Sequence, residues 1–250
     1  RIAAEGMVLA TVDKEAKVGV VIEVNSETDF VAKNEQFKTF VADLAKIVAE
    51  TNPATVEELM TKAMEDGNTV EAGLQEKILV IGENIKIRRF VRYEGPCVAY
   101  IHAGGTHGVL VKFETSDEVF AKPEFEAYGK DIAMQIAAAN PTYLVREDVP
   151  VEVLEKEKEI LTQQAINEGK PAAIAEKMVA GRIAKYYKEN CLVEQAFVKD
   201  DKQTITAYTN ATAKELGGDI KIVAFTRFEK GEGIEKKVDD FAAEVAAMSK

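Results

Sequence analysis

An internal repeat constrains the fold of this chain more than any other feature of its sequence. The segments 19–53 and 108–141 both begin with Gly-Val, continue as an apolar run, pass through a polar stretch into a helical pattern, and end in Asn-Pro. A one-residue gap in their alignment pairs Phe37 with Phe125. Because a repeated sequence marks a repeated structural unit, we expect two copies of one fold.

A second pair of segments supports the repeat. The segments 82–94 and 217–229 are identical at seven of thirteen positions. Their apolar residues alternate with polar ones, which predicts a strand at the end of each copy. In the first copy this alternation places Arg88 and Arg89 on opposite faces of the strand.

Each copy is therefore predicted to run strand, strand, helix, strand. The predicted elements of the first copy are strands at 8–12, 18–24 and 84–93 and a helix at 30–50. Those of the second copy are strands at 98–102, 109–113 and 219–227 and a helix at 125–139. The short connections between the first two strands favour antiparallel hairpins. The fold class is thus α+β, with two tandem related subdomains, each a small antiparallel sheet with packed helices.

The two copies differ in what precedes the closing strand. The first copy inserts an amphipathic helical stretch at 56–72. The second inserts 151–198, in which two apolar helical stripes flank the turn sequence Gly169-Lys170-Pro171, and this pattern predicts an antiparallel coiled-coil hairpin. At the end of the chain, one apolar face predicts a C-terminal helix that docks on its own domain or on a partner. Its members are Val238, Phe241, Val245 and Met248.

These patterns divide the chain into four parts. They are an N-terminal core subdomain at 1–95, a C-terminal core subdomain at 96–150 plus 199–230, the inserted hairpin at 151–198, and a C-terminal helical module at 231–250. No structure is assigned to the connection at 199–216, and what precedes Arg1 is left open.

The acidic balance of the chain argues against several functions. With 32 Lys and Arg against 43 Asp and Glu, the net charge is −11, which disfavours binding to nucleic acid or to an anionic membrane. No apolar run approaches the ~18–20 residues of a membrane span. Cys97 and Cys191 lack framework spacing, which favours a reducing compartment. No phosphate loop or enzyme signature is present, so neither a cofactor nor a direct nucleotide site is expected.

The segment 25–31, Asn-Ser-Glu-Thr-Asp-Phe-Val, joins a strand to a helix in the first copy. Taken alone, the pattern is typical of a helix start, in which Asp29 caps the helix and Phe30 makes a contact in the core. The equivalent stretch of the second copy, 115–120, lacks the Thr-Asp-Phe string. A purely architectural requirement should appear in both copies. The difference indicates that this loop has a function of its own, and with the hairpin and terminal helix it favours a partner-binding protein.

Five stretches of the chain together resemble the bacterial translation elongation factor Ts family. They are 23–33, 81–89, 102–111, 169–182 and 228–248. The resemblance extends over essentially all of 1–250, whereas the small three-helix module, similar to a ubiquitin-associated (UBA) domain, that usually begins the family has no counterpart in this sequence. It implies a guanine nucleotide exchange factor for elongation factor Tu in the bacterial cytoplasm. Such a factor has no bond-making chemistry, and therefore no catalytic residues, cofactor or metal.

The resemblance also implies roles for particular residues. Thr28, Asp29 and Phe30 form the exchange wedge, in which Phe30 enters between two helices of the GTPase domain of elongation factor Tu. The supporting partner contacts are Ile81, Gly82, His102, Phe241, Val245 and Met248. The inserted hairpin resembles a motif that contributes to self-association in some members, so a homodimer or a two-to-two complex is left open.

Two other classes stay open from the residues themselves. One is an acidic scaffold or chaperone that binds a partner without changing that partner's ligand, and the other is a hydrolase with a carboxylate or His102 in a cleft. His102 and His107 flank a Gly-Gly turn, but no third ligand is nearby in sequence, so no metal site is expected and His107 is assigned no role. Release of GDP from elongation factor Tu distinguishes the three classes.

Overall fold

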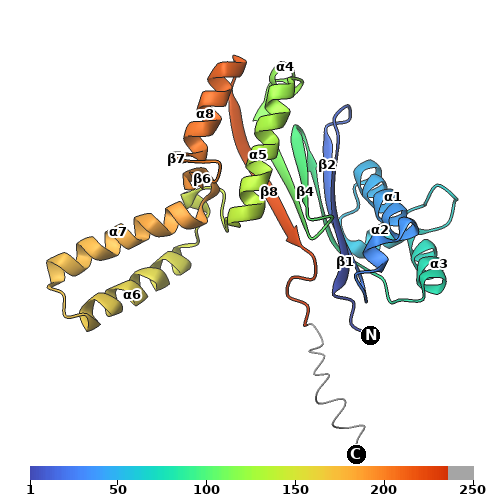
Figure 1. The fold of residues 1–250 in the computed structure, drawn as a ribbon, viewed down its shortest axis with the longest axis horizontal. Helices are drawn as coiled ribbons and strands as arrows, with labels where there is room; N and C mark the ends of the chain where they lie inside the picture. Colours follow the sequence, from blue (N-terminus) through green and yellow to red (C-terminus); the bar gives the residue numbers. More distant parts are fainter. Residues whose placement is uncertain (236–250) are drawn as a thin grey trace, which may run out of the picture.

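The computed structural model describes residues 1–235, which form eight α-helices and three small antiparallel sheets. Two of these sheets have three strands each and lie at the centre (Figure 1). The first has the order β1 (Glu5–Asp13), β2 (Val18–Ser26), β3 (Lys86–Glu94). The second has the order β4 (Cys97–His102), β5 (His107–Thr115), β8 (Ile220–Glu229). The identical order in both sheets confirms the repeat.

The two sheets pack face to face, so the molecule has four layers. Helices of the first copy cover the outer face of the first sheet, and helices of the second copy cover that of the second sheet (Figure 1). The residues buried between the sheets are Val8, Ala10, Val21, Cys97, Leu110 and Phe228. Because both faces of the first sheet are covered, β2 is buried along its whole length, which explains its nearly continuous apolar sequence.

Two glycines at equivalent positions of the repeat permit this close approach of the sheets. A Cβ atom on Gly19 would lie 2.6 Å from Cδ1 of Leu110, and one on Gly108 would overlap the side chain of Val8. Both residues belong to the central strands of their sheets. The Gly-Val start of each repeat is therefore a packing requirement between the copies.

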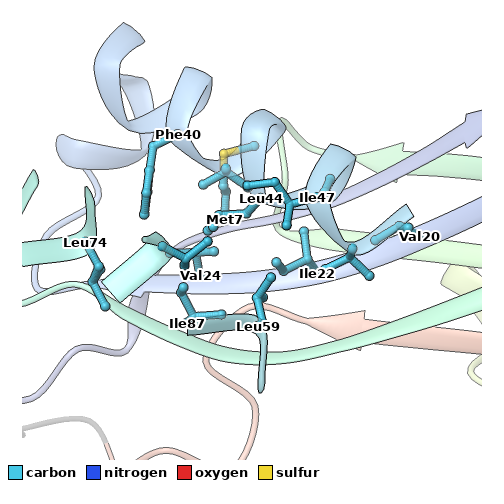
Figure 2. Close-up of a cluster of buried hydrophobic side chains, with 14 of the residues drawn as sticks. Met7, Val20, Ile22, Val24, Phe40, Leu44, Ile47, Leu59, Leu74 and Ile87 are labelled. Atoms are coloured by element: carbon cyan, nitrogen blue, oxygen red, sulfur yellow. The ribbon is translucent and has the colours of Figure 1, made fainter. Parts of the chain in front are cut away.

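The main helices of the two copies match closely. Helix α1 (Glu35–Thr51) and helix α5 (Pro123–Ala139) have 17 residues each, and each ends at an asparagine in the left-handed conformation followed by proline. Figure 2 shows the core under α1, where strand residues meet helix residues. Among those labelled are Met7, Val20, Ile22, Val24, Phe40, Leu44 and Ile47. The predicted start of the first helix at residue 30 is wrong, because Asn34 caps α1 by accepting hydrogen bonds from the N–H groups of Gln36 and Phe37.

Both copies carry a β-bulge at the same place. The register between the central and closing strands shifts between Glu23 and Val24 in the first sheet and between Lys112 and Phe113 in the second. The predicted alternation of Arg88 and Arg89 is interrupted by this bulge. As a result both arginines reach the same carboxylate, that of Glu23.

The insertion in the first copy contains two helices where the sequence pattern predicted one amphipathic stretch at 56–72. Helix α2 (Val56–Met60) ends early, and helix α3 (Val70–Ile81) begins after a turn in which the side chain of Asp66 accepts the N–H of Asn68. The connection 199–216 of the second copy is also structured. It contains the strand β7 (Asp200–Thr204), paired with β6 (Ala196–Phe197), and helix α8 (Ile205–Leu216), which packs against α5.

The large insertion forms two helices that lie side by side and project from the sheets (Figure 1). They are α6 (Val151–Asn167) and α7 (Ala172–Asn190), joined at the predicted turn. Few of their apolar side chains are enclosed: Ala165, Ala175 and Ile183 are buried, whereas Ile160, Ile166 and Ile174 are exposed.

The remaining described elements are short: α4 (Asp117–Phe120), η1 (Val31–Lys33), η2 (Arg146–Asp148) and η3 (Leu192–Glu194). The predicted terminal helix with Phe241, Val245 and Met248 lies outside the described residues. Among the described helices, none combines the length and the apolar character that crossing a bilayer requires.

Candidate functional site

The Thr-Asp-Phe loop follows β2 directly and leaves its aromatic ring in solvent. Thr28 is half-buried, Asp29 is exposed, and Phe30 is 76% exposed. The interpretation of Phe30 as a core contact is therefore wrong, and Asn34 rather than Asp29 caps the following helix. An aromatic ring left in water is available to a partner surface, where its burial would be favourable.

The backbone of this loop is held by one side chain from a distant part of the chain. Oε2 of Glu83 accepts hydrogen bonds from the N–H groups of Glu27 (3.1 Å) and Thr28 (3.0 Å). Oε1 of Glu83 accepts the hydroxyl of Thr28 at 2.6 Å. A carboxylate that takes three hydrogen bonds from adjacent groups fixes their relative orientation.

The loop returns the same kind of contact. Oε1 of Glu27 accepts the backbone N–H of Asn84 at 2.8 Å, and Oε2 forms an ion pair with Arg1 at 3.4 Å. The hydrogen bond from Asn84, more than the nearby Arg1, holds the pKa of the Glu27 carboxyl below its ordinary value. Two carboxylates, Glu27 and Glu83, thus join the segments 27–28 and 83–84 reciprocally. We call this pair the double clasp.

The double clasp brings together two groups of predicted site residues. Gly82 ends α3 in the left-handed conformation, with φ of 78°, and the next residue is Glu83. Ile81 and Gly82 therefore precede the clasped segment directly and lie close to Thr28. Leu79 and Val80, in the last turn of α3, are 82% and 59% exposed and were not among the predicted site residues. The signal in the sequence is the run of four apolar residues at 78–81, which is more than one buried face of a helix can accommodate.

The second copy provides an internal comparison for this loop. The second copy is one residue shorter between its central strand and its main helix, and the two large apolar residues of that stretch, Val119 and Phe120 of the short helix α4, are 2% and 8% exposed. The position of Glu83 corresponds to Gly218, where a Cβ atom would lie 2.7 Å from the side chain of Val119. In the copy without the clasp, the large apolar residues of this stretch therefore pack into the core, and neither is left exposed as Phe30 is.

Comparison with known proteins decides the family. The family described as Elongation factor TS matches residues 27–232. The chain is 49% identical over 249 residues to Elongation factor Ts of Clostridium botulinum (strain Eklund 17B / Type B), covering 98% of this chain and 81% of that protein. It is 50% identical over 250 residues to that of Clostridium kluyveri (strain NBRC 12016), with the same coverage. The identity to Elongation factor Ts of Trichlorobacter lovleyi is 49% over 256 residues, covering 100% of this chain and 82% of that protein.

The chain belongs to the elongation factor Ts family.

In this elongation factor Ts family member, His102 does not belong to the Phe30 loop. It is the last residue of β4, in the hairpin that joins β4 to β5. Its ring is exposed, its Nδ1 is 3.1 Å from the hydroxyl of Tyr100, and its ring centroid is 5.9 Å from that of His107. The N–H of Val8 donates to the carbonyl of Gly105 at 2.8 Å, which ties this hairpin to β1 near the end where the Phe30 loop leaves the first sheet.

Groups suited to metal or nucleophilic chemistry are also placed by the structure. Within residues 1–235, no three His, Cys, Asp or Glu side chains gather in a way that could hold a metal ion. Cys97 and Cys191 are both buried and free, and burial raises the pKa of each thiol to about 11. Both thiols are therefore protonated at neutral pH and are poor nucleophiles.

A buried carboxylate that the sequence reasoning missed lies close to the end of the described chain. Glu23 is 0% exposed, and its Oε1 accepts the N–H of Gly231 at 2.7 Å. Arg88 and Arg89 pair with its two oxygens at 3.1 and 2.5 Å. Burial by itself would raise the pKa of Glu23, but the hydrogen bonds from Gly231, Asn25 and Arg89 hold that pKa below its ordinary value.

A difference between the two copies could have indicated this Glu23 cluster. The positions equivalent to Glu23, Arg88 and Arg89 are Lys112, Val223 and Ala224 in the second copy. One acidic and two basic residues are thus lost together. Coordinated loss of complementary charges between repeats is a signal of spatial contact.

Proposed function

We propose that the Thr28–Phe30 loop is the element through which this protein drives release of GDP from its partner. As a member of the elongation factor Ts family, the chain acts in translation elongation as a guanine nucleotide exchange factor for elongation factor Tu. The observation that carries the assignment of the loop is the 76% exposed ring of Phe30 on a backbone fixed by Glu83.

The energetics of a buried aromatic ring suit this role. Moving a Phe side chain from water into an apolar pocket contributes about 1.5–3 kcal/mol. Because the loop is already ordered in the free protein, little conformational entropy is lost when the ring enters the partner. Phe30 would wedge between helices of the GTPase domain and displace the groups that hold magnesium and phosphate there, while Thr28 and Asp29 make polar contacts beside it.

Exchange then follows from thermodynamic linkage. A protein that binds the nucleotide-free partner more tightly than the GDP-bound partner must weaken GDP binding by the same factor. A coupling of about 4–6 kcal/mol accelerates release roughly 10³–10⁴-fold if it acts wholly on the dissociation rate. No residue of this chain need touch the nucleotide, and no bond of the nucleotide is made or broken.

The supporting surface would extend beyond the loop. We place Ile81 and Gly82 on the same side of the interface, because the double clasp holds their segment against Thr28. His102 and the second sheet would face another domain of elongation factor Tu. The remaining proposed contacts are Phe241, Val245 and Met248, in the C-terminal module that follows the Gly231 anchor.

We retain the four-part organisation as part of the proposal: core subdomains at 1–95 and at 96–150 plus 199–230, a hairpin at 151–198 and a terminal module at 231–250. The exposed Ile160, Ile166 and Ile174 support a coiled-coil hairpin with apolar surface left for association, as a homodimer or a two-to-two complex with elongation factor Tu. A translation factor of this kind works in the cytoplasm.

The direct test is Phe30→Ala. At a fixed concentration of the factor, we expect release of fluorescent GDP from elongation factor Tu to slow about 10-fold or more, the equivalent of losing the burial of one ring. The melting temperature should stay unchanged, because the ring lies in solvent in the free protein. Val198→Ala, which removes a half-exposed apolar side chain elsewhere, is the matched control. Normal stimulation by Phe30→Ala would remove the loop from the mechanism.

A further inference from the structure

The double clasp has a consequence for the proposed exchange loop, and the inference drawn from it rests on that proposed function. We infer that Glu83 is a positioning residue: its carboxylate fixes the backbone at Glu27 and Thr28 and so holds Phe30 in the orientation in which it enters elongation factor Tu. Glu83 acts through the loop and needs no contact with the partner.

The contacts made by Glu83 are suited to orienting a short loop. They reach two consecutive N–H groups, those of Glu27 and Thr28, and the hydroxyl of Thr28, all within three residues of Phe30. Hydrogen bonds to an ionised carboxylate are shorter and roughly twice as strong as those between neutral groups. The reciprocal bond from the N–H of Asn84 to Glu27 prevents the two segments from sliding past each other.

Glu83 is itself held in place by the core. Leu74 of α3 is 6% exposed and Ile85 is 2% exposed, so buried residues anchor the chain on both sides of Glu83. Thr69 caps the start of α3 by accepting the N–H of Ala72 at 3.2 Å. The core of the first copy therefore fixes the orientation of the loop through the capped helix α3.

The second copy shows that the repeated fold does not need this clasp. The positions of Glu83 and Glu27 are occupied there by Gly218 and Ser116. The hydroxyl of Ser116 accepts the N–H of Val119 at 3.2 Å, the chain forms α4, and Val119 turns inward. The clasp thus occurs only in the copy whose loop carries an exposed aromatic ring, which favours a role in presenting that ring.

Loss of the clasp should reduce apparent affinity more than stability. When only a fraction of molecules holds the binding-competent loop, the apparent dissociation constant rises in inverse proportion to that fraction. A fall of the competent fraction to about one tenth would weaken apparent binding about 10-fold. The half-buried N–H groups of Glu27 and Thr28 can meanwhile bond to water, so the cores remain folded.

The experiment compares Glu83→Ala with Glu83→Gln in release of fluorescent GDP from elongation factor Tu, titrated with the factor. For Glu83→Ala we expect the half-saturating concentration to rise about 10-fold. We expect faster hydrogen exchange at the amides of Glu27 and Thr28, with unchanged protection in α1. Glu83→Gln should recover much of the affinity, since its amide oxygen can accept both N–H groups. Glu76→Ala, an exposed glutamate of the same helix, is the matched control.

A double-mutant cycle separates positioning from direct contact. If Glu83 acts through Phe30, Glu83→Ala should add little to the loss already caused by Phe30→Ala. Equal losses in both backgrounds would mean that Glu83 touches the partner, and loss of α1 protection would make it a structural residue; either result overturns the inference. If the wild-type protein fails to release GDP, the proposed function itself is wrong. If only Phe30→Ala is impaired and Glu83→Ala matches wild type, the positioning inference alone is wrong.

Discussion

At the scale of single residues, Glu23 shows how a buried charge is kept in this fold. An isolated carboxylate without solvent would be strongly unfavourable, and it persists where complementary groups surround it. Here Arg88 and Arg89 supply two positive charges, and the N–H of Gly231 supplies a neutral donor. The guanidinium carbon of Arg89 also lies 4.1 Å from the ring centroid of Phe228. The cluster therefore joins the first sheet to the end of the second.

Replacing Glu23 with glutamine should destabilise the protein in a pH-dependent way. The folded-state pKa of Glu23 lies below the ordinary value of 4.5, so the stabilisation by this carboxylate is present above about pH 4.5 and is lost as the pH falls through the folded-state pKa. At pH 7 we expect a loss of about 3 kcal/mol, the lower end for breaking a buried ion pair, because both arginines reach solvent. Urea unfolding across the pH range measures this.

The difference between wild type and Glu23→Gln should shrink as the pH falls below about 4.5 and through the lowered folded-state pKa of Glu23, where the wild-type carboxyl becomes protonated. Glu57→Gln, at an exposed end of α2, is the control for loss of one carboxylate. A stability difference that stays constant from pH 7 to pH 3 would show that shape, and not charge, explains the effect.

At the scale of elements, the α6–α7 hairpin is separable from the cores except at its base. Leu192 and Phe197 are buried in the core of the second copy, and the N–H of Leu192 donates to the carbonyl of Tyr143 at 2.9 Å. Arg146 stacks on Tyr187, with 4.5 Å from its guanidinium carbon to the ring centroid. The outer part of the hairpin has no such anchors, since its Ile160 and Ile174 are exposed.

Replacement of residues 158–182 by a short Gly-Ser connection should leave both cores folded. Shortening a surface connection changes the closure entropy by only about 0.6 kcal/mol per twofold change in length. We expect the melting temperature of the remainder to change little, as measured by circular dichroism, with protection against limited proteolysis retained. Global unfolding of this variant would show that the hairpin contributes to the core.

At the scale of the whole molecule, face-to-face packing of the two sheets depends on the absence of side chains at Gly108 and Gly19. Gly108→Ala should cost about 1–3 kcal/mol, because the added methyl group overlaps Val8 across the interface. Gly181→Ala is the control, because a Cβ atom added to Gly181 in α7 would meet no neighbouring side chain within 4 Å. Alanine is favoured over glycine in a helix by about 0.5–1 kcal/mol. Urea unfolding tests both, and a neutral Gly108→Ala would show that the sheets can separate without cost.

The same packing gathers the proposed partner-binding features at one end of the molecule. The Phe30 loop leaves the end of β2 that pairs with the start of β1, and the hairpin carrying His102 is bonded to β1 through Val8 and Gly105. The described chain also finishes here, with Gly231 on Glu23 and Lys230 paired with Glu5. Residues separated by two hundred positions thus lie at the same end of the two sheets.

The sequence by itself determined the features that depend on near neighbours. The repeat predicted two units of strand, strand, helix and strand, the helical pattern predicted the helices observed as α1 and α5, and Gly169-Lys170-Pro171 predicted the turn between α6 and α7. Family membership was also readable, because the motifs around Phe30 and Ile81 stand in the sequence itself. Such features arise from periodicity, turn chemistry and capping, which act within a few residues.

Only the tertiary structure decided the features that join distant segments. Face-to-face packing of the sheets, the Glu23 cluster and the double clasp each bring together residues that are tens to two hundred positions apart. The exposure of Phe30 belongs to this group, because adjacent apolar residues of one loop differ: Phe30 is 76% exposed, whereas Val31 is 6% exposed. The physical reason is that a local pattern specifies which residues are apolar or charged, whereas the partner that each one meets is fixed only when the layers pack.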